Sequence, residues 1–236
     1  MIRKILKIIG VFVIALIVVA VALFLYYNEP LPTPLKASEE RADVLAHKML
    51  EAIEYGKYQD TRYLDWSFQN GKNFYHWDRK VGKVRVRFKG KTVHLNLVRP
   101  EESTVSEGEK IVQGDKRERS IQQAMKNFHN DSFWVVAPFK IFDSGTKRQL
   151  VYLADGNTGL LVIYTSGGST PGDSYLWKLG PDGTPLSFKM WVSILPIGGL
   201  EVGWTDWRKY QSGAFLSKKR TLGPIELEIG NLKAYN

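Results

Sequence analysis

The chain of 236 residues contains no cysteine. This absence excludes disulfide bonds, thiol nucleophiles, zinc–thiolate sites and a membrane anchor carried on an acylated cysteine. Covalent cross-links are not required for stability here, because a domain of about 200 residues buries enough surface when it folds.

Histidine is also scarce, and the familiar metal and catalytic spacings are missing. The four histidines are His47, His76, His94 and His129, and none stands in an H-E-x-x-H motif or another metal-ligand spacing. We therefore interpret them as structural and predict no metal site, no cofactor and no catalytic residues.

The serines do not form a recognisable nucleophile motif. A serine nucleophile of the G-x-S-x-G type needs a strand-to-helix elbow, but the segment SGGST at 166–170 is followed by Pro171 and Gly172 and reads as a loop. We expect the protein not to be an enzyme. A hydrolase would become the better interpretation if folding brought His76 or His94 beside Asp78 and a serine.

One long apolar run is present, at residues 8–27, and it contains no charged residue. About 20 apolar residues in a helix span a hydrocarbon core of about 30 Å. The basic residues of the tip at 1–7 favour a cytoplasmic N-terminus, so we predict a single-pass anchor in a bacterial inner membrane with the main domain in the periplasm. A cleaved signal peptide is the alternative, with Ala20 and Ala22 at the cleavage site; we favour the anchor because the run continues to Tyr27.

Acidic residues are in the minority. The net charge is +9, and three of the positive charges precede the apolar run, which leaves an excess of six on the rest of the chain. An exported domain of this sign is attracted to anionic lipid headgroups rather than to nucleic acid. The strand-like stretch KVRVRFK predicts a basic face that contacts such headgroups, formed by Lys83, Arg85, Arg87 and Lys89. A solvated strand face is the simpler alternative.

After a proline-rich linker at 28–37, residues 38–236 read as one domain. The spacing of apolar residues predicts a helix from Ser38, as N-cap, to Tyr55, ended by Gly56, and a second helix over 119–129. The remainder alternates with period 2, as strands do. Turn residues in 69–72, 89–91 and 180–183 predict hairpins. Further strands are expected at 133–137, 149–153, 160–165, 201–207, 213–217 and 225–229.

This pattern predicts a mainly β, α+β domain. We expect a large curved antiparallel sheet, a half-barrel of about eleven strands with two covering helices, in addition to the transmembrane helix. The domain is rich in aromatics, with 7 Trp, 11 Phe and 11 Tyr in the chain. Because two short helices cannot cover a large concave face, the inner face is a candidate site for an apolar ligand. A fully packed interior is an equal alternative.

Alternation along the strands selects the candidate lining residues, which are Leu64, Trp66, Phe68, Val86, Phe88, Tyr175, Trp177, Phe188 and Met190. Three segments are similar to a known family: LDWSF at 64–68, FWVVAPFKIFDSG at 133–145 and YLWKLGPDGTPLSFKMWV at 175–192. Their order resembles the bacterial lipoprotein-carrier superfamily, which is LolA/LolB-like and includes the outer-membrane lipoprotein-sorting proteins, over roughly residues 38–236. The resemblance implies an eleven-stranded half-barrel that holds acyl chains on a concave aromatic face.

The anchor departs from that pattern, because a tethered domain cannot ferry cargo between membranes. The expected function is therefore a membrane-tethered extracytoplasmic binding protein for a lipid or an acylated lipoprotein. The alternatives are a scaffolding subunit of a bacterial envelope complex with a filled barrel and, less strongly favoured, an envelope hydrolase.

Overall fold

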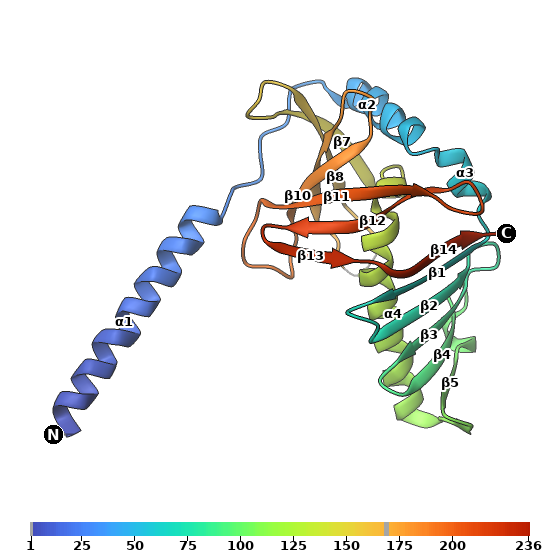
Figure 1. Ribbon diagram of the computed structural model, residues 1–236, viewed down its shortest axis with the longest axis horizontal. Coiled ribbons are helices and arrows are strands. Elements are labelled where there is room, and N and C mark those ends of the chain that lie inside the picture. The colour runs from blue at the N-terminus through green and yellow to red at the C-terminus, as the bar shows by residue number, and fades with distance from the viewer. Residues whose placement is uncertain (1, 168–169) are drawn as a thin grey trace.

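The computed structural model describes residues 2–167 and 170–236, so that the loop expected at 166–170 lies partly outside the described residues. Figure 1 shows one long helix, α1 (Ile2–Tyr27), that projects away from a β-rich domain. Residues 28–37 connect the two and contain no helix or strand. The backbone N–H of Leu35 donates to the carbonyl of Leu150 over 2.8 Å, so this connection is attached to the domain.

A search of the described residues finds no helix that is long and apolar enough to span a membrane. Part of the span predicted at 8–27 falls on side chains outside the described set, namely those of residues 8, 17, 20, 23 and 25–27.

The domain is mainly β, as predicted, but its described strands form two antiparallel sheets of seven rather than one sheet of about eleven. The sheets do not close into a barrel. The first sheet has the order β14 (Gly230–Tyr235), β1 (Tyr63–Phe68), β2 (Asn73–Asp78), β3 (Lys83–Phe88), β4 (Lys91–Asn96), β5 (Thr104–Glu107) and β6 (Lys110–Ile111). The second has the order β13 (Ile225–Glu228), β12 (Phe215–Leu222), β11 (Leu200–Lys209), β10 (Pro185–Trp191), β9 (Ser174–Leu179), β8 (Thr158–Tyr164) and β7 (Thr146–Tyr152).

Consecutive strands pair through short turns, which explains why the sheets are antiparallel. Between β1 and β2, Asn70 (φ 55°) and Gly71 (φ 78°) both adopt left-handed backbone. Lys89 (φ 46°) and Gly90 (φ 74°) do the same between β3 and β4. This is the conformation that the tightest hairpin turns require, and the predicted hairpins at 69–72 and 89–91 are confirmed.

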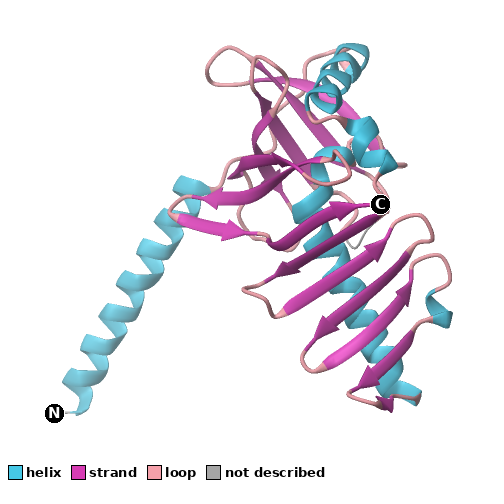
Figure 2. Ribbon diagram, turned by 45° about the vertical axis from the view of Figure 1, so that its right-hand side comes forward, coloured by secondary structure: helices cyan, strands magenta, loops and turns pink. Residues whose placement is uncertain are grey.

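The C-terminal segment joins the two sheets. Only Ile229 separates β13, at the edge of the second sheet, from β14, which pairs with β1 of the first. The predicted strand 225–229 therefore ends one residue early, and the strand that follows it was not expected. Figure 2 shows that the two sheets follow one another along this segment.

Three α-helices cover the domain: α2 (Glu39–Ala52), α3 (Tyr55–Asp60) and α4 (Gly114–Val136). Two short 3-10 helices lie at Pro100–Glu102 and Ala137–Phe139. The helix predicted over 38–55 breaks at Glu54, which has left-handed backbone (φ 54°), and Gly56 lies inside α3 rather than ending the helix. Ser38 occupies the N-cap position of α2 without capping it; its Oγ accepts the N–H of Leu150 over 3.0 Å instead.

The strand predicted at 133–137 is wrong, because α4 continues to Val136. Ile121, Ala124, Phe128 and Val135 are buried, and this spacing of three, four and seven keeps one face of a helix inward to its end. The helix therefore has 23 residues instead of the 11 expected over 119–129. In Figure 1 it runs behind the strands of the first sheet and reaches the second sheet at its C-terminal end.

Candidate functional site

The nine predicted lining residues all lie on the inner faces of the two sheets. Leu64, Trp66, Phe68, Val86 and Phe88 come from the first sheet, and the other four come from β9 and β10 of the second. The exposed fraction of each is 8% or less, and all nine belong to one core cluster. The alternation therefore predicted their side of the sheet correctly, while their contact with a ligand remains a prediction.

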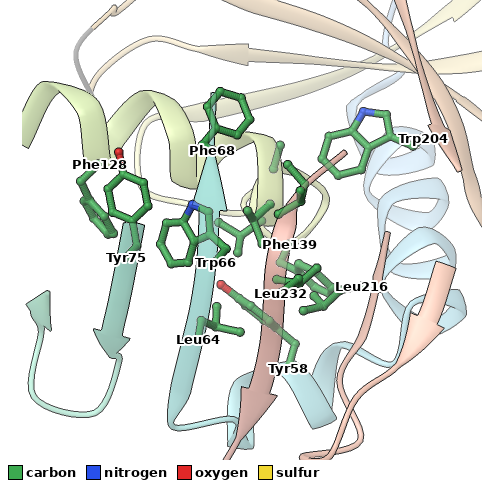
Figure 3. Close-up of a cluster of buried hydrophobic side chains, with 14 of the residues drawn as sticks. Tyr58, Leu64, Trp66, Phe68, Tyr75, Phe128, Phe139, Trp204, Leu216 and Leu232 are labelled. Carbon is green, nitrogen blue, oxygen red and sulfur yellow. The ribbon is translucent and has the colours of Figure 1, made fainter. Parts of the chain in front are cut away.

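Aromatic side chains of α4 lie against this face. The ring centroid of Phe128 is 6.1 Å from that of Trp66 and 5.2 Å from that of Trp77. Towards the C-terminus of the helix, Phe133 lies 4.8 Å from Tyr175, and Trp134 lies 6.2 Å from Phe188. Figure 3 shows Phe128 of α4 beside Tyr75 and Trp66 of the first sheet. The helix thus occupies the concave side that the sequence left for a ligand.

A buried carboxylate fixes α4 to the first sheet. Asp131 is 1% exposed, and its Oδ2 accepts hydrogen bonds from Asn73 Nδ2 (2.8 Å) and from the Tyr75 hydroxyl (2.6 Å). Asn130 Nδ2 donates to Oδ1 over 2.9 Å. Burial, followed by the nearby Asp131 charge, raises the pKa of Tyr75 well above its ordinary value, so that its hydroxyl stays a donor. We call this set the Asp131 latch.

A buried guanidinium fixes the other end of α4 to the second sheet. Arg220 of β12 is 2% exposed, and its Nη2 donates to the carbonyl of Trp134 in the last turn of α4. Its Nη1 donates to Ser217 Oγ (2.7 Å) and to Lys219 O (2.9 Å). The guanidinium carbon lies 3.4 Å from the ring centroid of Trp204. Burial lowers the pKa of Arg220 well below its ordinary value, and the negative end of the helix dipole favours a cation here.

Several buried donors on this inner layer have no acceptor among the described residues. The indole Nε1 atoms of Trp66, Trp77, Trp177 and Trp204 are all buried without a hydrogen bond, as is Nε of Arg220. An unsatisfied buried donor costs about 1–3 kcal/mol, and native structures contain few of them. The layer between α4 and the sheets thus consists mainly of apolar side chains but contains donors that are free to hydrogen-bond.

Sequence reasoning did not place Trp77, Trp204 or Arg220 among the lining residues. It expected a covering helix only over 119–129, and so missed the contacts of Phe133 and Trp134. Trp77 lies on the inner face with Leu64 and Val84, its register partners, so alternation along β2 could have found it. Nothing local indicates that Arg220, within the run KKR, points inward.

The surface hollows lie elsewhere. One of about 810 Å³ is next to α2 and α3 and is lined in part by His47, Glu51, Tyr55 and Phe142. Another, of about 330 Å³, lies over the first sheet and is lined by polar groups that include Asp65, His76 and Arg85. Both have mixed charged and apolar linings; of the nine predicted lining residues, Trp66 borders the second hollow and none borders the first.

Among the described residues, His76 and Asp65 form a histidine–carboxylate pair, with Nδ1 and Oδ1 2.6 Å apart. The Tyr235 hydroxyl lies 3.2 Å from Asp65 Oδ2. Asp78, which the sequence proposed as the partner of His76, binds Arg62 instead over 3.0 Å. In residues 2–167 and 170–236 no serine hydroxyl is hydrogen-bonded to His76, and no three His, Asp or Glu side chains come together as metal ligands.

The basic stripe faces solvent. Lys83, Arg85 and Arg87 are exposed on β3, with Val84, Val86 and Phe88 buried between them, so the predicted alternation is confirmed. Lys89 is exposed in the turn that follows. Within the described part of the chain, none of these four cations has a carboxylate oxygen within 4.0 Å; Arg87 lies over the ring of Phe74, 4.9 Å from its centroid.

No protein-family model matches the chain, and no curated protein matches it.

Proposed function

We propose that this chain is a membrane-tethered, extracytoplasmic binding protein for a lipid or an acylated protein, which it holds on the inner aromatic face of its sheets. The observation that carries the proposal is the set of four buried indole N–H groups on that face that have no acceptor in the part of the chain that the structure describes. An acyl ester or amide would supply both apolar contact and hydrogen-bond acceptors. Its hydrocarbon chain would contact the rings, and its carbonyl oxygens would accept from the indole N–H groups.

In this proposal α4 occupies the place of the ligand in the closed state. Phe128, Phe133 and Trp134 make the ring contacts that an acyl chain would make after α4 moves away. Four unpaired donors, at about 1–3 kcal/mol each, weaken the closed packing by several kcal/mol and bring an open state closer in free energy. The apparent affinity for the ligand then rises in proportion to the fraction of molecules in the open state.

The tether in the proposal is α1. The helix carries no charge after Lys7, and the side chains of Val11, Phe12, Ile14 and Val18 are 60–68% exposed, so they do not pack on the domain. A bilayer would cover them, with the domain on the periplasmic side of a bacterial inner membrane. The unpaired cations Lys83, Arg85, Arg87 and Lys89 supply contacts to anionic headgroups, at about 1 kcal/mol for each cation near the surface.

The resemblance to the lipoprotein carriers agrees with a curved sheet that holds an acyl chain. Transfer of cargo to a second membrane is not part of the proposal, because a tethered domain cannot carry it. Presentation of an acylated ligand at the inner membrane surface is the corresponding role.

The test is to purify the full chain, extract it with organic solvent and identify acyl species by mass spectrometry. The stripped protein is then mixed with a fluorescent fatty acid. Tyr75→Phe removes one hydrogen bond of the Asp131 latch, so we expect faster uptake of the probe than in the unsubstituted chain. Tyr152→Phe is the matched control, since Tyr152 is 68% exposed on β7. A chain that releases no acyl species and shows no saturable uptake of the probe overturns the proposal.

A second candidate is a scaffolding subunit of an envelope complex whose interior is permanently filled. The burial of all nine lining residues to 8% exposure or less favours it. The same preparation separates the two, because a scaffold yields a stoichiometric protein partner and no lipid.

A further inference from the structure

The loop between β10 and β11 is apolar and exposed. Its sequence from Ser193 to Ile197 is SILPI, and residues 193–196 are all exposed, with Ile194 at 66% and Leu195 at 38%. Val192, at the start of the loop, packs against the main hydrophobic cluster, but Ile194, Leu195 and Ile197 belong to neither cluster, so the domain itself does not explain their apolar character.

Hydrogen bonds attach this loop to the end of α1. The Asn28 N–H donates to the carbonyl of Phe24, which continues the last turn of the helix (2.9 Å). Asn28 Oδ1 then accepts the N–H of Gly198 over 2.9 Å, and the Glu29 N–H donates to the carbonyl of Gly198 over 3.0 Å. Trp191 Nε1 donates to the carbonyl of Glu29 over 2.8 Å. The loop therefore stays next to the point where α1 ends.

Gly198 is required for this attachment. A Cβ atom at this position would lie 2.4 Å from Cδ1 of Trp191 and 2.8 Å from the carbonyl oxygen of Glu29. Backbone and ring atoms cannot both give way by that much, so any side chain at 198 separates the loop from the start of the linker.

A second exposed apolar residue lies on the same side. β13 begins at Ile225, which is 61% exposed, and Figures 1 and 2 place the start of β13 on the side of the domain from which α1 leaves. Two nearby carboxylates are in ion pairs, and a third, Asp173, is 5% exposed and accepts the N–H of Ser193 over 2.9 Å. Glu29 is paired with Lys189 (2.7 Å), and Glu226, next to Ile225, is paired with Lys219 (2.8 Å). We call Ile194, Leu195 and Ile225 the apolar rim.

We propose that the apolar rim inserts into the interface of the bilayer that holds α1, so that the domain rests on the membrane instead of swinging on its linker. The inference rests on the proposed function, because it needs α1 in the bilayer. Exposed apolar side chains beside paired charges suit the headgroup boundary, and Trp191, whose ring is partly exposed here, belongs to the residue types enriched there.

The absence of cysteine allows a clean test with single cysteines, each labelled with an environment-sensitive nitrobenzoxadiazole dye. The full chain is reconstituted into vesicles of phosphatidylcholine and phosphatidylglycerol. The labelled variants are Ile194→Cys in the rim, Val19→Cys in α1, and Val98→Cys, at a 75% exposed position after β4, as the aqueous control. We expect a blue-shifted emission and quenching by brominated lipid at 194 and 19, and neither at 98.

The outcomes separate the two proposals. If the dye at 19 reports lipid and the dye at 194 reports water, insertion of the apolar rim is refuted and insertion of α1 is supported. A dye at 19 in water overturns the tether, and the rim with it. Gly198→Ala in the Ile194→Cys chain should move the dye at 194 into water while α1 stays inserted. Gly56→Ala is the matched control, since a Cβ there meets nothing within 4 Å, and it should leave the emission unchanged.

Discussion

Removal of the Asp131 carboxylate should loosen α4 by an amount that the structure allows one to work out. In Asp131→Ala, Asn73 Nδ2 and the Tyr75 hydroxyl lose the acceptor at 2.8 and 2.6 Å and stay buried beneath the helix. At about 1–3 kcal/mol for each orphaned donor, the free energy of unfolding should fall by about 4 kcal/mol. For a domain of this size the melting temperature should fall by roughly 12 °C, at about 2–4 °C per kcal/mol.

The assay is urea unfolding followed by tryptophan fluorescence, because Trp66 and Trp134 lie on the two sides of the layer that opens. The sharper test is the double variant with Tyr75→Phe. Once the carboxylate is gone, the tyrosine hydroxyl is an unpaired donor, so its removal should restore part of the lost stability. In the chain that keeps Asp131, the same substitution should destabilise by about 1.5–3 kcal/mol, the usual contribution of a hydrogen bond to a charged group.

Asp115→Ala is the control on the same helix. Asp115 is exposed in the first turn of α4, where loss of its favourable interaction with the helix dipole costs about 1 kcal/mol or less. If Asp131→Ala costs no more than this control, or if Tyr75→Phe lowers the stability of the Asp131→Ala chain further, the Asp131 latch does not hold the helix.

Substitutions at three further positions address the core and the titrating groups. Trp177→Ala should lower the free energy of unfolding by about 3–5 kcal/mol, whereas Trp177→Phe should cost clearly less because it also removes an unpaired N–H; equal losses in urea unfolding would contradict that reasoning. Burial raises the pKa of Tyr58 to about 12, so the folded state keeps a proton that the unfolded state loses near pH 10, and stability should fall as the pH rises from 10 to 12. Tyr58→Phe should flatten that fall in thermal melts, and an unchanged slope would count against it. The hydrogen bond from Arg62 lowers the pKa of Asp78, so its stabilisation should be present above pH 3.8 and be lost as the pH falls through the lowered value. The difference in melting temperature between the unsubstituted chain and Asp78→Asn should therefore vanish in acid, and a difference that persists there would refute the assignment.

Alternation was sufficient to predict the buried face of β3, but not of every strand: Leu186 was expected on the face of Phe188, and the register shift between Pro185 and Ser187 leaves it 46% exposed. In KVRVRF the exposed cations and buried apolar residues follow the period of the strand, since a residue and its second neighbour share a side whatever the rest of the chain does. The turns were predictable for the same reason. Asn70, Gly71 and Gly90 adopt the left-handed backbone that these residue types favour, whereas Lys89 (φ 46°) adopts it because the turn requires it.

What fills the concave side was not predictable, because it depends on contacts between segments far apart in the chain. The stretch FWVV at 133–136 suits a strand by residue type, and helix propagation from Gly114 decided otherwise. Arg220 stands in the run KKR, where a solvated cation is the natural expectation, yet the last turn of α4 supplies the carbonyl it binds. The sequence thus predicted which strand residues line the inner face, but not which residues of α4 pack against them.

The pairing of β14 with β1 has a consequence for biogenesis. Tyr235 and Asp65 are hydrogen-bonded across 170 residues of chain, so the residues of β14 are synthesised long after those of β1. Until they emerge, β1 is an open edge able to pair with a foreign strand. The first sheet can be completed only after β14 has been synthesised, and removal of Gly230–Tyr235 should leave the edge of β1 exposed to aggregation.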